Sequence, residues 1–142
     1  MCDEAELSLE STLESVRTGR QFAADTLAHW GLDARGPVGR RVEEIVLVTS
    51  ELLTNAVRAS GGGAELRIVA HRDHVLVAVH DQSTEPAVAR SAAPSDTGGR
   101  RLAIVDALST RWGTTPSRRA GKVVWSELSF PTNAALAERC RL

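Results

Sequence analysis

One stretch in the middle of the chain constrains the fold most, because its apolar pattern changes period at a run of three glycines. Over residues 37–60 the apolar side chains recur at helical intervals, and Gly61-Gly62-Gly63 can adopt the positive φ angles that end a helix. The segments 66–70 and 74–80 then alternate between apolar and polar residues, and Arg72-Asp73 fits a tight turn between them. The pattern predicts a long helix followed by two adjacent antiparallel strands.

The remaining segments predict more elements of the same two kinds. Ser11-Thr12-Leu13-Glu14 has the spacing of a capping box and predicts a helix over about 12–30, which Gly31 would end. The other expected elements are an edge strand over 6–10, a helix over 100–112, a strand over 121–130 and a short helix beginning at 131–133. The expected order is β-α-α-β-β-loop-α-β-β-α. It indicates an α+β two-layer sandwich, with helices packed on one face of a mixed, mostly antiparallel sheet.

Length and composition favour a single soluble domain over residues 1–142. The chain is 42% hydrophobic and 25% charged, and its longest apolar runs are far shorter than the roughly 18 residues of a membrane span. Its acidic start lacks the basic region of a signal peptide. Cys2 and Cys140 stand at opposite ends without metal-site spacing, which predicts reduced, incidental thiols rather than a disulfide framework. We therefore expect a cytoplasmic protein.

Charge is nearly balanced overall but uneven along the chain. The net charge of -1 argues against a nucleic-acid binder that relies on electrostatic attraction. Residues 97–122 carry six basic side chains and one acidic one, whereas residues 1–16 carry five acidic side chains and no basic one. The basic patch is either a solvated surface or the neighbourhood of an anionic ligand. Lys122 is the only lysine beside sixteen arginines, and we infer no function from that ratio.

A long polar loop is expected over residues 82–99, which are rich in Ser, Thr, Pro, Ala and Gly. Compact domains seldom keep a structureless loop of this length unless it is functional, so a lid is one interpretation. Gly98-Gly99 closes the loop just before the expected helix, whose first turn holds Arg100 and Arg101. Glycines there let a phosphate approach free backbone N–H groups, although they serve simple turns as well.

Three polar residues are candidates for a ligand site. Glu51 and Asn55 are four residues apart on one helix, so their side chains lie about 40° from each other on the helical wheel and can converge on one ligand. Asp81 ends a strand where the long loop begins, and its carboxylate could accept hydrogen bonds from a ligand's amino group. Taken one by one, these residues also fit a solvated helix face and an ordinary turn.

Several motifs, taken in order, resemble those of a known family. They are Glu51-Leu52-Leu53-Thr54-Asn55-Ala56-Val57-Arg58, Val79-His80-Asp81-Gln82-Ser83, Gly99-Arg100-Arg101-Leu102-Ala103-Ile104-Val105-Asp106-Ala107-Leu108, Arg111-Trp112-Gly113 and Gly121-Lys122-Val123-Val124-Trp125-Ser126-Glu127-Leu128. Together they are similar to the boxes of the anti-sigma-factor-type ATPase/kinase domains. Those domains are small relatives of the histidine kinase, gyrase and Hsp90 ATP-binding fold. The resemblance covers roughly residues 5–130.

The resemblance implies a role for each candidate residue. Glu51 would be the general base toward an attacking hydroxyl, and Asn55 would coordinate the Mg²⁺ that bridges the phosphates of ATP. Asp81 would receive the adenine amino group, and Gly98-Gly99 would cradle phosphate beside Arg100 and Arg101. The implied acceptor is a serine or threonine of an anti-anti-sigma partner, and the implied regulatory target is a sigma factor. No direct contact with nucleic acid or membrane is expected, and a homodimer remains open.

Arg101 departs from the family pattern, because the family usually has a second glycine at this position, as in Gly-Arg-Gly-Leu. A bulky side chain there would crowd the phosphates. The sequence therefore leaves two hypotheses open. One is a protein serine/threonine kinase that uses ATP and Mg²⁺ and sequesters a sigma factor. The other is a non-catalytic protein-binding module of the same fold, in which ATP binding is weak or lost.

Overall fold

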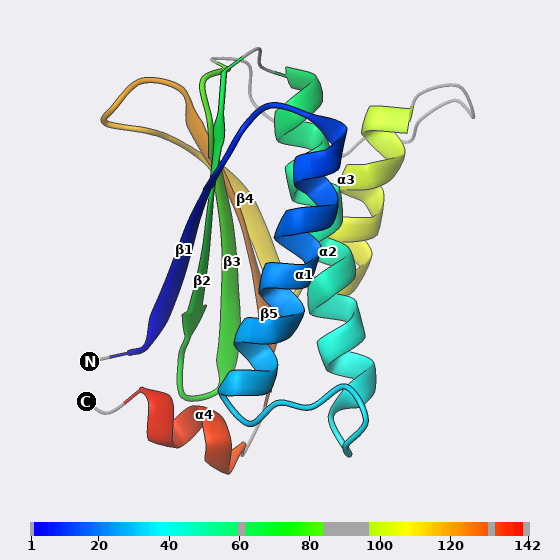
Figure 1. Ribbon diagram of the computed structural model, residues 1–142, viewed down its shortest axis with the longest axis vertical. Helices are drawn as coiled ribbons and strands as arrows, with labels where there is room; N and C mark the ends of the chain where they lie inside the picture. The colour runs from blue at the N-terminus through cyan, green and yellow to red at the C-terminus, as the bar shows by residue number, and fades with distance from the viewer. Residues whose placement is uncertain (1, 60–61, 84–96, 131–132, 141–142) are drawn as a thin grey trace.

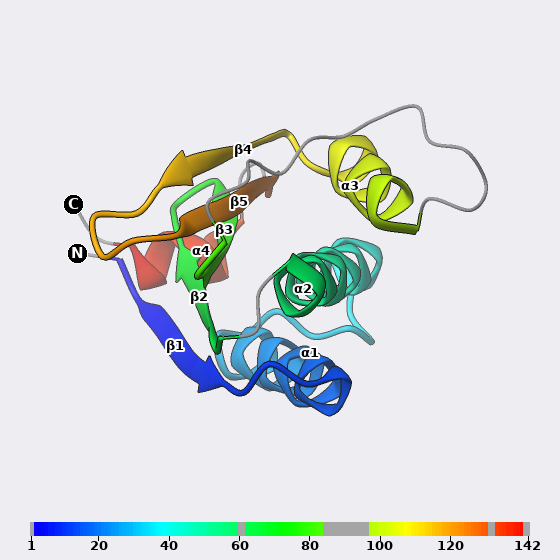
Figure 2. The same cartoon turned by 90° about the horizontal axis from the view of Figure 1, so that it is seen from above.

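The computed structural model describes residues 2–59, 62–83, 97–130 and 133–140, with residues 97–101 described by their backbone. They form two layers, a five-stranded sheet and a row of helices (Figures 1 and 2). The strands are β1 (Glu4–Leu9), β2 (Ala64–Ala70), β3 (His74–Asp81), β4 (Arg111–Pro116) and β5 (Lys122–Ser129). The helices are α1 (Leu13–His29), α2 (Gly39–Ala59), α3 (Thr97–Leu108) and α4 (Ala134–Arg139).

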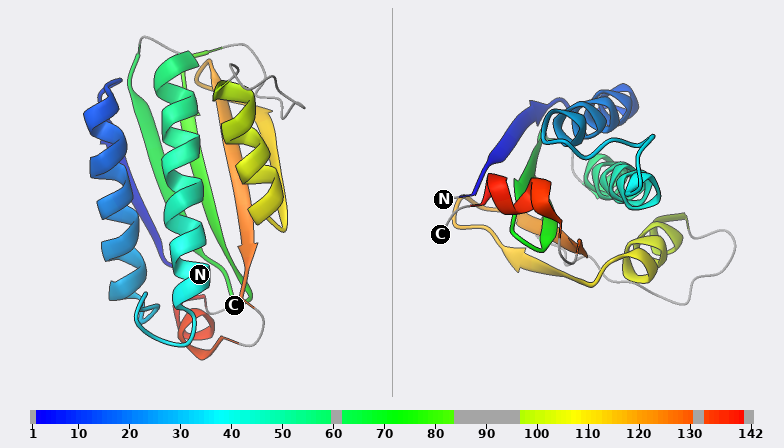
Figure 3. Two further views of the ribbon diagram at one scale, coloured as in Figure 1. Left: turned by 90° about the vertical axis from the view of Figure 1, so that its right-hand side faces the viewer. Right: turned by 90° about the horizontal axis from the view of Figure 1, so that it is seen from below.

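The sheet has the order β1-β2-β3-β5-β4, and each of its four strand pairings is antiparallel. Helices α1, α2 and α3 cover one face, while α4 lies across one end of the sheet (Figure 3). The prediction of an α+β sandwich with helices on one face is therefore confirmed, and the sheet is antiparallel rather than mixed. None of the described helices is long and apolar enough to cross a membrane.

The core lies between the central strands and α2. Alternate residues of β3 and β5 point toward the helices because successive side chains of a strand face opposite sides. The helical spacing over 37–60 predicts one broad apolar arc facing the sheet, made of Val42, Ile45, Val46, Thr49, Leu52, Leu53 and Ala56. Its buried residues in α2 include Ile45, Leu52 and Ala56. Val46 of that arc is only partly buried, whereas Val48, outside it, is buried. The helix is packed on the sheet and between α1 and α3, so it buries a broader face than one stripe.

The ends of α1 follow local sequence signals with one shift. The N-cap is Thr12, one residue later than the predicted capping box implies, and its Oγ1 accepts a hydrogen bond from the backbone N–H of Ser15 at 3.2 Å. Gly31 has a φ of +86° and its N–H donates to Ala28 O, so it ends the helix as predicted.

The predicted third helix is wrong at both ends. Helix α3 begins at Thr97 and ends at Leu108, whereas the sequence predicts 100–112. The segment before it is therefore shorter than the expected loop over 82–99, and residues 84–96 of that loop lie outside the described part of the chain. Trp112 belongs to β4, where it pairs with Ser126 of β5. Its indole Nε1 donates to Asp106 at 2.8 Å. The helical spacing continued into this segment, but pairing with β5 decided its conformation.

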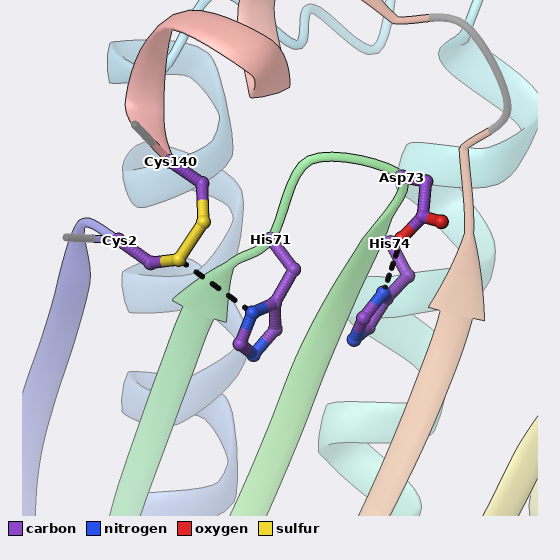
Figure 4. Close-up of a disulfide and its surroundings, with 5 residues drawn as sticks. All are labelled: Cys2, His71, Asp73, His74 and Cys140. Carbon is purple, nitrogen blue, oxygen red and sulfur yellow. Dashed lines mark hydrogen bonds and ion pairs between the residues drawn. A yellow bond between two sulfur atoms is a disulfide. The ribbon is translucent and has the colours of Figure 1, made fainter. Parts of the chain in front are cut away.

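The prediction of two incidental, reduced cysteines is wrong for this structure. A disulfide joins Cys2, just before β1, to Cys140, just after α4, across 138 residues (Figure 4). The two ends meet because α4 returns the chain to the edge where β1 begins, and the N–H of Asp3 donates to Arg139 O at 2.7 Å. Sequence distance gave no indication of this contact.

Candidate functional site

The predicted site residues are carried by four elements that meet at one end of the sheet. The end of β3, the start of β5, the C-terminal end of α2 and the first turn of α3 all lie at this end (Figures 1 and 3). Helix α2 contacts β3, β5 and α3. The fold therefore brings Asp81, Asn55 and the Gly98-Gly99 segment to the same end of the molecule.

Asp81 is buried at the last position of β3, on the helix-covered side of the sheet, and it is 1% exposed. One carboxylate oxygen, Oδ1, accepts a hydrogen bond from the N–H of Ser83 at 2.7 Å. The other, Oδ2, is buried and has no hydrogen-bond partner among the described residues. A buried carboxylate oxygen without a hydrogen bond is costly unless something binds it, so Asp81 stays a candidate for ligand binding.

Lys122 is the charged neighbour of Asp81, and sequence reasoning missed it. The two residues are paired in the β3–β5 register, and Lys122 Nζ lies 3.6 Å from Asp81 Oδ2. Lys122 is only 4% exposed, although it begins a strand whose alternate residues are buried. The alternation of β5 could have identified Lys122, because it places this lysine on the core-facing side of the strand. A lysine there needs an anionic partner or a ligand.

Gly121 allows the close contact between the two strands at this point. Its φ is +78°, and a Cβ at this position would lie 2.0 Å from Asp81 O. Only glycine accepts both that backbone conformation and that approach without strain. The Gly121-Lys122 pair thus places an ammonium group next to Asp81 Oδ2, the carboxylate oxygen that accepts no hydrogen bond.

Glu51 and Asn55 lie one turn apart on α2, and both are partly buried rather than solvated. The side-chain Nδ2 of Asn55 is buried and has no hydrogen-bond partner among the described residues. A buried amide N–H group is stable only when it donates to an acceptor, and the described residues supply none to Asn55, just as they supply no donor to Asp81 Oδ2. This burial favours the ligand-binding interpretation of the pair over a solvated helix face.

The glycine segment lies inside a helix rather than before one. Helix α3 begins at Thr97, so Gly98, Gly99 and Arg100 have helical backbone in its first turn and Arg101 follows directly. The prediction that Gly98-Gly99 close the loop before the helix is therefore wrong, but the N–H groups of a first helical turn lack intrahelical partners and suit an anion. The side chains of Arg100 and Arg101 lie outside the described part of the structure.

Ion pairs occupy much of the basic patch predicted over 97–122. Arg111 donates to both oxygens of Glu127, at 3.0 and 3.1 Å, and this hydrogen bonding lowers the pKa of Glu127. Arg119 pairs with Glu65 and lowers its pKa in the same way. With Lys122 paired to Asp81, three of the six cations already have acidic partners. Half of the predicted patch is thus already ion-paired.

A cavity of 360 Å³ lies on the other face of the sheet from Asp81. Its lining includes Glu65, His80 and Arg119, and His80 Nε2 donates to Ala120 O at 2.9 Å. His80 and Asp81 are adjacent in β3, so their side chains point to opposite sides of the sheet. The cavity is therefore separate from the site formed by α2, α3, β3 and β5.

Comparison with known proteins gives one finding about the family. The model of the family described as histidine kinase-like ATPase domain matches residues 9–126, which include Glu51, Asn55, Asp81 and Lys122. Among curated proteins, no match was found. The match covers most of the chain and supports ATP binding, in agreement with the superfamily that the motifs resemble. The chain belongs to the histidine kinase-like ATPase domain family.

Proposed function

We propose that this chain binds ATP with Mg²⁺ at the site formed by α2, α3, β3 and β5, and that it phosphorylates a serine or threonine of a protein partner. The observation that carries the proposal is the pair of buried, unsatisfied polar atoms, Asp81 Oδ2 and Asn55 Nδ2, within a histidine kinase-like ATPase domain. Each atom is explained by a bound nucleotide that completes its hydrogen bonding.

Asp81 and Lys122 would recognise the purine. Adenine presents a donor, its exocyclic amino group, next to an acceptor, ring nitrogen N1. A carboxylate oxygen beside an ammonium group offers the complementary acceptor and donor. Guanine presents the reverse order at the same edge, with an acceptor where adenine has its amino group and a donor at N1. The pair therefore favours adenine at both positions.

Asn55 and the start of α3 would hold the phosphate end. The buried Nδ2 of Asn55, which has no partner among the described residues, would donate to a phosphate oxygen, and its Oδ1 is the ligand type that Mg²⁺ prefers. When bound, Mg²⁺ neutralises charge on the transferred phosphoryl group. The N–H groups in the first turn of α3, around Gly98 and Gly99, have no intrahelical partners and would bind phosphate oxygens.

Glu51 would act on the acceptor. A carboxylate one turn before Asn55 is placed to orient the attacking hydroxyl and to take its proton as the new O–P bond forms. By resemblance, the hydroxyl belongs to an anti-anti-sigma protein, and the chain also sequesters a sigma factor in the cytoplasm. Phosphorylation of that partner would then free the chain to bind the sigma factor.

A second candidate function is a non-catalytic protein-binding module. One observation favours it, namely Arg101 where the resembling family has glycine. Titration of the purified protein with ATP, with and without Mg²⁺, separates the two. Saturable binding that tightens with Mg²⁺, followed by transfer of labelled phosphate to a partner, supports the kinase. Absence of saturable binding at millimolar ATP refutes it.

A further inference from the structure

Three side chains that bind soft metals meet at the end of the sheet opposite Asp81. Cys2 precedes β1, His71 follows β2 and Cys140 follows α4 (Figure 4). Their ligand atoms, the two Sγ atoms and a histidine ring nitrogen, all lie within 4.8 Å of one another. Neither the nucleotide-binding proposal nor the family match assigns a role to this cluster, which we call the Cys2/His71/Cys140 cluster.

One ligand distance in the cluster, from Cys2 Sγ to His71 Nδ1, already suits a tetrahedral metal ion, while the two bonded sulfurs separate only on reduction. Cys2 Sγ lies 3.7 Å from His71 Nδ1. In a tetrahedral zinc site, with Zn–S of about 2.3 Å and Zn–N of about 2.0 to 2.1 Å, the distance between a sulfur and a nitrogen ligand is about 3.6 Å. Cys140 is buried, whereas Cys2 and His71 are partly exposed. An ion can therefore reach the cluster from solvent, and water can supply the fourth ligand.

Contacts other than the disulfide hold the three residues together. The N–H of Asp3 donates to Arg139 O at 2.7 Å, and the N–H of Ala70 donates to Asp3 O at 2.9 Å. These two backbone hydrogen bonds involve the chain neighbours of Cys2, Cys140 and His71. The His71 ring is also stacked on His74, with centroids 4.4 Å apart. The cluster should therefore stay assembled when the disulfide is reduced.

We propose that the reduced Cys2/His71/Cys140 cluster is a Zn²⁺ site that the disulfide closes. Reduction by a dithiol transfers two electrons and two protons to the Cys2–Cys140 bond, which becomes two thiols while the reductant becomes a disulfide. Zinc then binds the two sulfurs as thiolates, with release of two protons, and binds Nδ1 of neutral His71. The same three residues thus hold either a disulfide or a metal ion, depending on redox conditions.

Metal titration of the reduced and oxidised chains tests this proposal. We expect one Zn²⁺ per reduced chain in competition with a chromogenic chelator, and none at this site in the oxidised chain. Co²⁺ in place of Zn²⁺ should give the thiolate charge-transfer band and the visible bands of a tetrahedral site. His71→Ala keeps both cysteines and should weaken binding by about a hundredfold or more. His29→Ala removes an exposed histidine of α1 and is the matched control.

Two results would overturn the proposal. One is a reduced wild-type chain that binds no stoichiometric zinc and gives no cobalt–thiolate band. The other is equal zinc affinity in wild type and in His71→Ala, which would leave a simple dithiol without the histidine. Circular dichroism of each variant confirms that the chain is folded, and the wild-type titration requires no substitution at all.

Discussion

Removing the proposed hydrogen bond between Lys122 and adenine N1 should lower ATP affinity without removing the nucleotide site. The analogue 1-deaza-ATP carries a C–H group in place of N1, so it cannot accept from the ammonium while its amino group can still reach Asp81. A hydrogen bond to a charged donor contributes about 1.5–3 kcal/mol, and Lys122 is buried, which places this bond within that range. We therefore expect wild type to bind 1-deaza-ATP about 10- to 150-fold more weakly than ATP.

Lys122→Met gives the second half of the test. It keeps the length of the side chain but removes the donor, so ATP and 1-deaza-ATP should bind this variant with equal affinity. The substitution also leaves the buried Asp81 carboxylate without its ionic partner, which costs stability, so thermal unfolding should be measured alongside. Arg118→Met removes an exposed cation from the same hairpin and should preserve the preference for ATP.

Isothermal calorimetry with both nucleotides in one Mg²⁺ buffer measures all of these affinities. Equal affinity of wild type for ATP and 1-deaza-ATP would refute the role of Lys122, even if ATP binds well. Failure of wild type to bind either nucleotide would instead refute the proposed function. The analogue needs no mutation, so the conclusion does not depend on whether Lys122→Met folds.

Four further predictions follow from the site and the disulfide. Asp81→Asn should lower ATP affinity by about 1.5–3 kcal/mol or abolish the preference for ATP over GTP, and calorimetry that finds both unchanged would remove Asp81 from the site. Glu51→Ala should slow phosphate transfer by about 100-fold or more while sparing nucleotide binding, whereas Asn55→Ala should weaken Mg²⁺-ATP binding; wild-type transfer rates in both variants would argue against a kinase. Arg101→Gly should tighten ATP binding by roughly tenfold, about 1.4 kcal/mol, because backbone donors can then approach the phosphates; weaker binding would make Arg101 a phosphate ligand. Cys2→Ser should lower the free energy of unfolding by up to about 5 kcal/mol under oxidising, metal-free conditions, since the disulfide spans 138 residues, and a denaturant midpoint equal to that of oxidised wild type would contradict this.

The local sequence pattern is enough to predict helices and strands that keep a single apolar period and end at a turn or stop signal such as glycine. The apolar spacing predicts α2, and α1 stops just before Gly31, whose positive φ residues other than glycine adopt poorly. The hairpin of β2 and β3 was predicted from alternation on both sides of a short polar link. Helical spacing and the position at a strand end make Asn55 and Asp81 candidates, and the two residues lie on elements that meet at one end of the sheet.

Contacts between distant residues decided what local pattern could not. Trp112 leaves a helical pattern because β4 gains a full ladder of hydrogen bonds with β5. Lys122 is a candidate for nucleotide binding only because β5 pairs it with Asp81, 41 positions earlier in the chain. Strand pairing determines which side chains meet. Cys2 meets Cys140 because α4 folds back to the start of β1. Each of these pairings depends on the path of the whole chain, since a contact across such distances forms only when the intervening elements are packed.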